Sequence, residues 1–161
     1  MGEGGAGPHD LTRMMRQQGG LYWSAAESQW YAEPKRLEGL GYLQSRKEPG
    51  RTRDRTHYLL TAAGRRAIRA WIAEPSGPPR VQNEAVVRVM AGDLADDEAV
   101  LESLAGLRAA LADQRAHLDE AERIAESLPH RARYLRLVHR LGRLVIDAHE
   151  QWLDEVEAEL S

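Results

Sequence analysis

The chain has 161 residues, 42% of them hydrophobic and 29% charged, which is ordinary for a folded globular protein. It contains no cysteine, so disulfides and thiolate metal sites are excluded. No apolar run approaches the roughly 18 residues of a membrane span, and no signal-peptide pattern opens the chain. These features predict a cytoplasmic protein without a membrane partner.

The formal net charge of −3 is divided unevenly along the chain. Residues 1–80 contain 13 Lys and Arg against 8 Asp and Glu, whereas residues 81–161 contain 9 against 17. The two balances are +5 and −8, which together give −3. A basic half can bind phosphates while an acidic half is repelled by them, so this division is compatible with binding to nucleic acid.

Glycine and proline dominate residues 1–9, which predicts no regular element there. The segment 11–18 is expected to be a helix, because its apolar residues recur at helical spacing. These residues are Leu11, Met14 and Met15. Asp10 is the predicted N-cap, and the glycine pair at 19–20 is expected to end the helix.

A second helix is expected to begin within residues 24–28 and to end within residues 39–41. Pro34 falls inside it, where a proline removes one backbone hydrogen bond and costs about 3 kcal/mol. Two interpretations are open. Either the helix kinks at Pro34, or it ends near Tyr31 and a new helix begins with Pro34 at its first position, where proline is tolerated.

Two apolar segments follow, at residues 42–43 and 58–60, and Pro49-Gly50 in the connection is a turn signal. The connection carries arginines at every second position, so one side of an extended ribbon would be strongly cationic. These are Arg51, Arg53 and Arg55. A helix that can enter a DNA groove, followed by a basic hairpin, predicts a winged helix.

The region from Trp23 to Gly64 resembles the PadR family of bacterial transcriptional regulators, and the similarity extends over about residues 2 to 92. The matching residues are Trp23-Ser24, Ser28-Gln29, Tyr31, Lys35-Arg36-Leu37-Glu38, Gly41, Tyr58 and Thr61-Ala62-Ala63-Gly64, followed by Trp71, Glu74-Pro75 and Pro79-Arg80. The resemblance implies a winged helix-turn-helix domain that binds operator DNA. It also implies leucine at the position of Pro34 and a further helix before the Gly-rich turn of residues 3–11. The chain is therefore expected to be truncated or to start at an internal Met.

After the hairpin, Thr61 is predicted to cap a helix that runs from Ala62 to about Ala73. The apolar side of this helix carries Ala67, Ile68, Trp71 and Ile72. A proline-rich linker follows at residues 75–83. A short apolar helix is then expected to open at Asn83 or Glu84 and to close at Gly92.

Two long helices complete the chain. Acidic residues 96–98 suit the N-terminus of the first, whose heptad seam is typical of a coiled coil. This seam comprises Leu104, Leu107, Leu111, Gln114, Leu118, Ala121, Ala125 and Leu128. Pro129 ends it, and a second helix repeats the spacing at Tyr134, Val138, Leu141, Val145, Ala148 and Trp152.

Two such helices cannot bury all of this apolar area against each other, so a symmetric homodimer is predicted. The PadR resemblance implies the same, because members of that family dimerise through C-terminal helices. The expected dimerisation residues are Leu104, Leu107, Leu111, Leu118, Leu128, Val138, Leu141, Val145 and Trp152.

The candidate DNA-binding residues come from the second helix and the wing. They are Ser24, Ser28, Gln29, Tyr31, Lys35, Arg36, Arg51, Arg53 and Arg55. Their side chains suit hydrogen bonds to phosphates or base edges. Alternatively, Tyr31 and Trp30 belong to the core, and the other candidates on the helix form a solvated face. For Trp30 we favour a place in the core.

The sequence does not support a metal site, a cofactor site or a catalytic site. The six histidines show no metal-ligand spacing, and there is no Gly-rich phosphate loop or nucleophile motif, so no metal, cofactor or enzymatic activity is expected. Trp152 is either a packing residue or a stacking wall for a small aromatic or amphipathic effector. The second interpretation follows from PadR-like proteins that bind phenolic acids or drugs between their two domains.

The predicted fold is mainly α with a small β-hairpin. It comprises a winged helix-turn-helix DNA-binding domain at residues 1–74, a linker at 75–83, and a helical dimerisation domain at 84–161. The predicted function is a DNA-binding transcriptional regulator, a repressor that a small-molecule effector releases. The alternative is a helical dimerisation or adaptor protein whose degenerate winged helix binds DNA poorly.

Overall fold

The computed structural model describes residues 4–17, 27–49, 54–79 and 81–161. The chain divides between Pro78 and Pro79 into two compact units, one with the β-hairpin and one with the two longest helices. Within the described ranges, no helix is long and apolar enough to cross a membrane.

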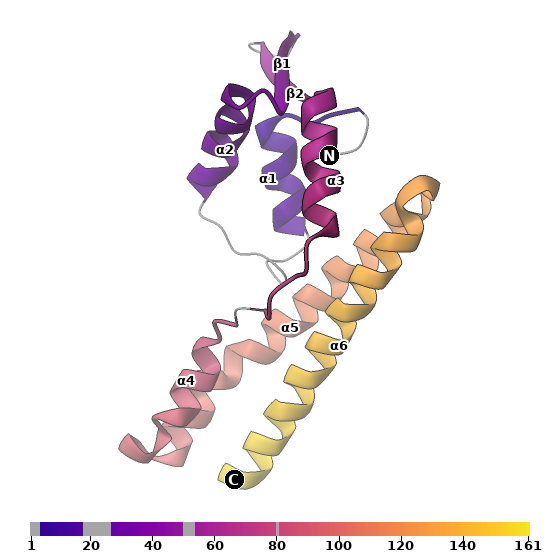
Figure 1. Ribbon diagram of the computed structural model, residues 1–161. Helices are drawn as coiled ribbons and strands as arrows, with labels where there is room; N and C mark the ends of the chain where they lie inside the picture. Colours follow the sequence, from indigo (N-terminus) through magenta and orange to yellow (C-terminus); the bar gives the residue numbers. More distant parts are fainter. Residues whose placement is uncertain (1–3, 18–26, 50–53, 80) are drawn as a thin grey trace. The chain divides into compact units, whose positions relative to one another are not determined.

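The first unit has the element order of a winged helix, as predicted. Its elements are α1 (Pro8–Gln17), α2 (Glu27–Gly39), β1 (Leu43–Glu48), β2 (Arg55–Leu60) and α3 (Ala62–Ala73). The two strands form an antiparallel hairpin, and the three helices lie below it in the view of Figure 1. Thr61 caps α3 as expected, because its Oγ1 accepts a hydrogen bond from the Gly64 backbone N–H at 3.0 Å.

The start of α1 differs from the prediction. The helix begins at Pro8, a position where proline costs no hydrogen bond. Asp10 lies inside the first turn, and its carboxylate accepts a hydrogen bond from the Gly7 backbone N–H at 3.4 Å. The assignment of Asp10 as the N-cap is therefore wrong. An acidic residue near a helix start can reach back over the first turn, and the sequence pattern does not separate the two roles.

Part of the Gly-rich segment is also ordered, contrary to the expectation for residues 1–9. Ala6 exchanges two backbone hydrogen bonds with Tyr58 of β2, at 3.1 and 3.0 Å, and both residues are buried. Gly5 allows this approach: its φ is +75°, and a Cβ there would lie 2.3 Å from the Tyr58 carbonyl oxygen. The glycine that suggested an irregular segment is therefore what lets the chain pair with the hairpin.

Helix α2 is continuous across Pro34. The interpretation in which one helix ends near Tyr31 and another begins at Pro34 is therefore wrong. The ring of Pro34 is buried, so its contacts with the core offset part of the lost backbone hydrogen bond.

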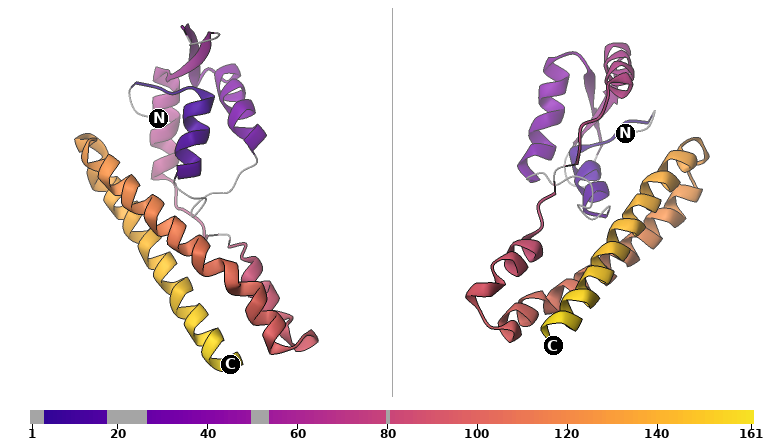
Figure 2. Two further views of the ribbon diagram at one scale, coloured as in Figure 1. Left: turned by 180° about the vertical axis from the view of Figure 1, so that it is seen from behind. Right: turned by 60° about the horizontal axis from the view of Figure 1, so that its bottom comes forward.

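In the second unit the two longest helices pack side by side, as all three views show (Figures 1 and 2). Its elements are α4 (Glu84–Met90), a short 3-10 turn η1 (Gly92–Leu94), α5 (Asp97–Glu126) and α6 (Pro129–Leu160). Asn83 caps α4 and Asp96 caps α5, where the Asp96 Oδ1 accepts from the Ala99 N–H at 2.8 Å. A two-residue connection joins α5 to α6, so the long helices run antiparallel.

A heptad pattern forms the core between α5 and α6. The buried residues of α5 are Val100, Leu104, Leu111, Leu118 and Ala125, which include half of the seam predicted for this helix. The buried residues of α6 are His139, Gly142, Ile146, Leu153 and Val156. The stripe singled out from the sequence of α6 lies roughly a third of a turn away. Three of its members, Tyr134, Val138 and Leu141, are 67%, 42% and 53% exposed.

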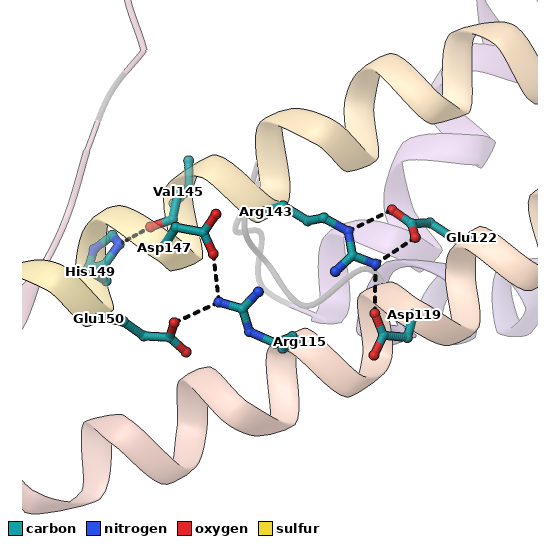
Figure 3. Close-up of polar contacts among 8 residues, drawn as sticks. All are labelled: Arg115, Asp119, Glu122, Arg143, Val145, Asp147, His149 and Glu150. Atoms are coloured by element: carbon teal, nitrogen blue, oxygen red, sulfur yellow. Dashed lines mark hydrogen bonds and ion pairs between the residues drawn. The ribbon is translucent and has the colours of Figure 1, made fainter.

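Three arginines connect the long helices along one edge of this core, and each binds two carboxylates. Figure 3 shows two of these groups, those of Arg115 and Arg143. Arg108 binds Asp154 and Glu157, Arg115 binds Asp147 and Glu150, and Arg143 binds Asp119 and Glu122, at 2.6–2.8 Å. In the third group the arginine comes from α6 instead of α5. A slip of one heptad would bring like charges together, so the reversal helps to fix the register of the two helices.

Candidate nucleic-acid interface

The candidate interface begins with the exposed side of α2. Ser28, Gln29, Lys35 and Arg36 are exposed, and Tyr31 is 46% exposed. At about 100° per residue they lie opposite the side that carries buried Pro34 and half-buried Trp30 and Leu37. The helix therefore has one side packed on its own unit and one side free to meet a groove.

Arg36, one of the two cations of α2, has a partner within its own helix. Arg36 forms a bidentate ion pair with Glu33, with contacts of 2.5 to 3.1 Å. These hydrogen bonds raise the pKa of Arg36 and lower the pKa of Glu33. Arg36 stays positive in any case, and a phosphate would have to compete with Glu33 for its guanidinium.

Glu38 holds the hairpin against the end of α2. One of its carboxylate oxygens accepts hydrogen bonds from the Ser45 backbone N–H at 3.0 Å and from the Ser45 hydroxyl at 2.5 Å. The turn between them requires Gly41, whose φ is +72°. Glu38 therefore positions the wing relative to α2.

The wing places basic side chains on one face of the hairpin. Arg55 pairs with Glu48 in the register, and Arg46 lies two residues away on the same face. Both arginines are exposed, and the Arg46 guanidinium contacts Glu48 at 2.6 Å. Ser24, Arg51 and Arg53 lie outside the described residues.

Two further cations lie on β1, outside the set of residues predicted from the loop that follows it. These are Arg46 and Lys47, both exposed, and the Lys47 ammonium contacts the Thr56 hydroxyl at 3.1 Å. The signal was available in the Arg-Lys-Glu run that precedes the Pro-Gly turn.

Comparisons with known proteins agree with this architecture. The family model described as "Virulence activator alpha C-term" matches residues 81–161. The virulence activator AphA of Vibrio cholerae has 30% sequence identity and a TM-score of 0.69, and the alignment covers 97% of this chain and 90% of that one. This chain belongs to the PadR-like family of winged-helix transcriptional regulators.

Two further structures show the same fold as this PadR-like regulator. Bacillus subtilis PadR in complex with operator DNA has a TM-score of 0.76 at 21% identity, covering 99% of this chain and 92% of that one. The PadR-like regulator BC1756 from Bacillus cereus has a TM-score of 0.64 at 13% identity, covering 97% and 86%. No curated protein matches the chain. Since the family consists of transcriptional regulators, the prediction that the protein is not an enzyme is confirmed.

Proposed function

We propose that this PadR-like regulator binds double-stranded DNA with α2 in the major groove and the wing on the flanking phosphates. The observation that carries the proposal is the exposed polar and basic side of α2, which lies opposite its packed side and is joined by Glu38 to a basic hairpin. The contacts would come from Ser24, Ser28, Gln29, Tyr31, Lys35, Arg36, Arg51, Arg53 and Arg55, to which we add Arg46 and Lys47. B. subtilis PadR, solved with operator DNA, offers the precedent.

We further propose that the protein acts as a repressor and that a small aromatic or amphipathic effector releases it. B. subtilis PadR has also been solved with p-coumaric acid, with 21% identity to this chain and a TM-score of 0.67. Trp152, half-buried on α6, is our candidate for the stacking wall. Since AphA is described as an activator, the direction of regulation needs its own test, with a reporter gene under the regulated promoter.

The wing gives the direct test of DNA binding. Replacing Arg51, Arg53 and Arg55 with Ala should weaken binding about equally for different duplexes, because phosphate contacts carry no sequence information. The slope of log affinity against log salt should flatten by about 0.9 for each lost phosphate contact. Fluorescence anisotropy with labelled duplexes at several salt concentrations measures both quantities.

The control removes charge elsewhere. Arg88 and Arg123 of the second unit are exposed, and each pairs with a carboxylate of its own helix. Replacing both with Ala should leave the salt slope unchanged. Equal slopes for the wild type and the wing variant would show that the wing does not touch DNA, and a wild type without affinity for duplexes would favour the adaptor function.

We also propose that the protein is a homodimer formed through α6. Its exposed apolar stripe is continuous over three turns and includes Tyr134, Leu137, Val138, Leu141 and Leu144. Charge divides the same helix: residues 129–143 hold five Arg and no acid, and residues 144–160 hold six Asp and Glu and no Lys or Arg. Two copies that pair antiparallel would place the basic half of each against the acidic half of the other.

Within this dimer, most of the predicted interface residues separate into two groups; Leu107 and Leu128 are half-buried and belong to neither. Leu104, Leu111 and Leu118 are buried within the α5–α6 hairpin of one chain, so they have little surface left for a partner. Val138 and Leu141 are exposed, and Val145 and Trp152 are half-buried on the same stripe. We therefore assign the proposed contact to the second group, together with Tyr134, Leu137 and Leu144.

Light scattering tests the dimer. The wild type should show about twice the monomer mass of 18.1 kDa at micromolar concentration. Leu141→Glu should shift it towards the monomer, because a carboxylate would be buried in an apolar contact. Leu40→Glu is the matched control: both leucines are 53% exposed, but Leu40 lies in the first unit. A wild type with monomer mass, or the same loss of dimer in both variants, would refute this assignment.

A further inference from the structure

Helix α4 is attached to the rest of its unit with little apolar burial. None of its seven residues, all of them described, is buried, and Val87 and Met90 are 62% and 78% exposed. It packs on α5, and its N-terminus is joined to α6 by a polar contact between Asn83 and His149. Because apolar burial contributes little, this contact has a large part in keeping the start of α4 in place.

The contact is a chain of hydrogen bonds in which every atom has a fixed role. Val145 offers a carbonyl oxygen, which can only accept, so the His149 Nδ1–H must donate to it, at 2.7 Å. Asn83 uses its Oδ1 to accept from the Ala85 and Val86 backbone N–H groups, at 3.1 and 3.4 Å. Its Nδ2 therefore faces the His149 Nε2, at 2.9 Å, and donates to it. A neutral imidazole protonated at Nδ1 satisfies the whole chain.

Protonation of His149 is incompatible with this arrangement. The Nε2 would then carry a hydrogen and face the hydrogens of the Asn83 amide. If the amide rotated to offer its oxygen, α4 would lose the acceptor that caps it; if it did not, the two donors would separate. Either response frees the first turn of α4.

We propose that Asn83 and His149 form an acid-sensitive latch, closed when His149 is neutral and opened when it is protonated. Asn83 follows directly on the proline-rich segment that leads from the first unit, so opening lengthens the connection between the two units. The latch rests on the contacts within the second unit and does not depend on the proposed DNA binding.

The charged groups around the latch are engaged with one another. On α4, Glu84 and Arg88 form an ion pair at 2.7 Å. Between α5 and α6, Arg115 binds Asp147 and Glu150, which flank His149 in the sequence (Figure 3). Imidazole side chains in general change charge between about pH 5 and about pH 8, so this is the range in which the latch is tested.

Hydrogen exchange of the full-length protein between about pH 8 and about pH 5 tests the latch. The rate at each amide is divided by its intrinsic rate, and residues 85–90 are compared with residues 111–118 of α5, which report on the hairpin as a whole. In the wild type, exchange of α4 relative to α5 should rise about fivefold or more on acidification, the factor expected from loss of a helix cap.

Two variants separate the latch from general acid effects. His149→Gln keeps an acceptor for Asn83 but does not titrate, so the ratio should become independent of pH. Asn83→Asp keeps the cap and offers a carboxylate to His149, so acid should now protect α4 and the dependence should invert. A ratio that is constant with pH in the wild type, that rises equally in His149→Gln, or that keeps its direction in Asn83→Asp would rule the latch out.

Discussion

Ile146→Ala should lower the free energy of unfolding of the α5–α6 hairpin by about 2–4 kcal/mol. Ile146 lies in the middle of α6, facing α5, and is fully buried, with 0% of its surface exposed. Its replacement removes three carbon atoms from a packed core and leaves a cavity that long, regular helices cannot collapse around. Denaturant unfolding followed by circular dichroism measures the loss, at one fixed protein concentration because the protein is proposed to dimerise.

The same substitution at Ile124 is the control. Ile124 belongs to the partner helix α5, but it is 45% exposed, so little area returns to water and no cavity forms. The Ile124→Ala variant should lose about 1 kcal/mol of its free energy of unfolding, or less. Equal losses at the two positions would mean that α6 does not pack on α5 through the stripe that contains Ile146.

The starts of the helices after the hairpin are well predicted by the sequence. Thr61 was expected to cap one helix, Asn83 or Glu84 to open the next, and acidic residues 96–98 to lie at the N-terminus of a third. The side chains of Thr61, Asn83 and Asp96 each accept a hydrogen bond from the first turn. Such contacts span only two or three residues, so the local sequence determines them. Asp10 shows the limit, because an acidic residue near a helix start can serve inside the first turn as well.

Which side of a helix meets which neighbour is much harder to derive. On α6 the more apolar stripe, with Tyr134, Leu137 and Leu141, is exposed in the single chain, while the stripe that faces α5 includes His139 and Gly142. Both stripes have heptad spacing, so periodicity alone cannot rank them. The ion pairs on the edge of the hairpin help to decide, and their partners lie more than 20 residues apart in the sequence.

For the candidate interface, periodicity separates the exposed side of α2 from its packed side, but it does not anticipate the buried Pro34. A local rule predicts a kink or a break there, whereas the helix is continuous and Pro34 is buried. Arg46 is not among the residues predicted from the sequence, because a strand position beside a loop does not by itself indicate a DNA contact. Its place on the face of Arg55 follows only from the register of the hairpin.

His139→Leu should raise the free energy of unfolding by about 1–3 kcal/mol near neutral pH. His139 is 3% exposed in the α5–α6 core, and its Nδ1 is buried without a hydrogen-bond partner among the described residues. Such an atom has given up its hydration without replacement, and leucine fills a similar volume without a polar group. The natural residue therefore weakens the core that it helps to fill.

The effect of this substitution should depend on pH, in a direction that the surroundings of His139 determine. Burial lowers its pKa; the charge of Glu122 opposes this, and that of Arg143 adds to it. The folded state therefore favours the neutral ring, while the unfolded chain takes up a proton near the ordinary pKa of about 6.5. The wild type therefore keeps its full free energy of unfolding above that pH and loses part of it as the pH falls below it. The difference in free energy of unfolding between His139→Leu and the wild type should grow on acidification from about pH 7 to about pH 5.

Unfolding curves across this range separate the two contributions. The difference between His139→Leu and the wild type at about pH 8 reports the cost of the buried nitrogen, and its growth towards about pH 5 reports the proton. Glu122, whose pKa its hydrogen bonds with Arg143 lower, loses its contribution only at more acidic pH, below the ordinary glutamate range. His117→Leu is the matched control, because His117 lies exposed on α5 and its replacement should give only a small difference. Parallel curves for His139→Leu and the wild type would show that this ring does not resist protonation, and a loss of stability at every pH would show that its Nδ1 has a partner in solution.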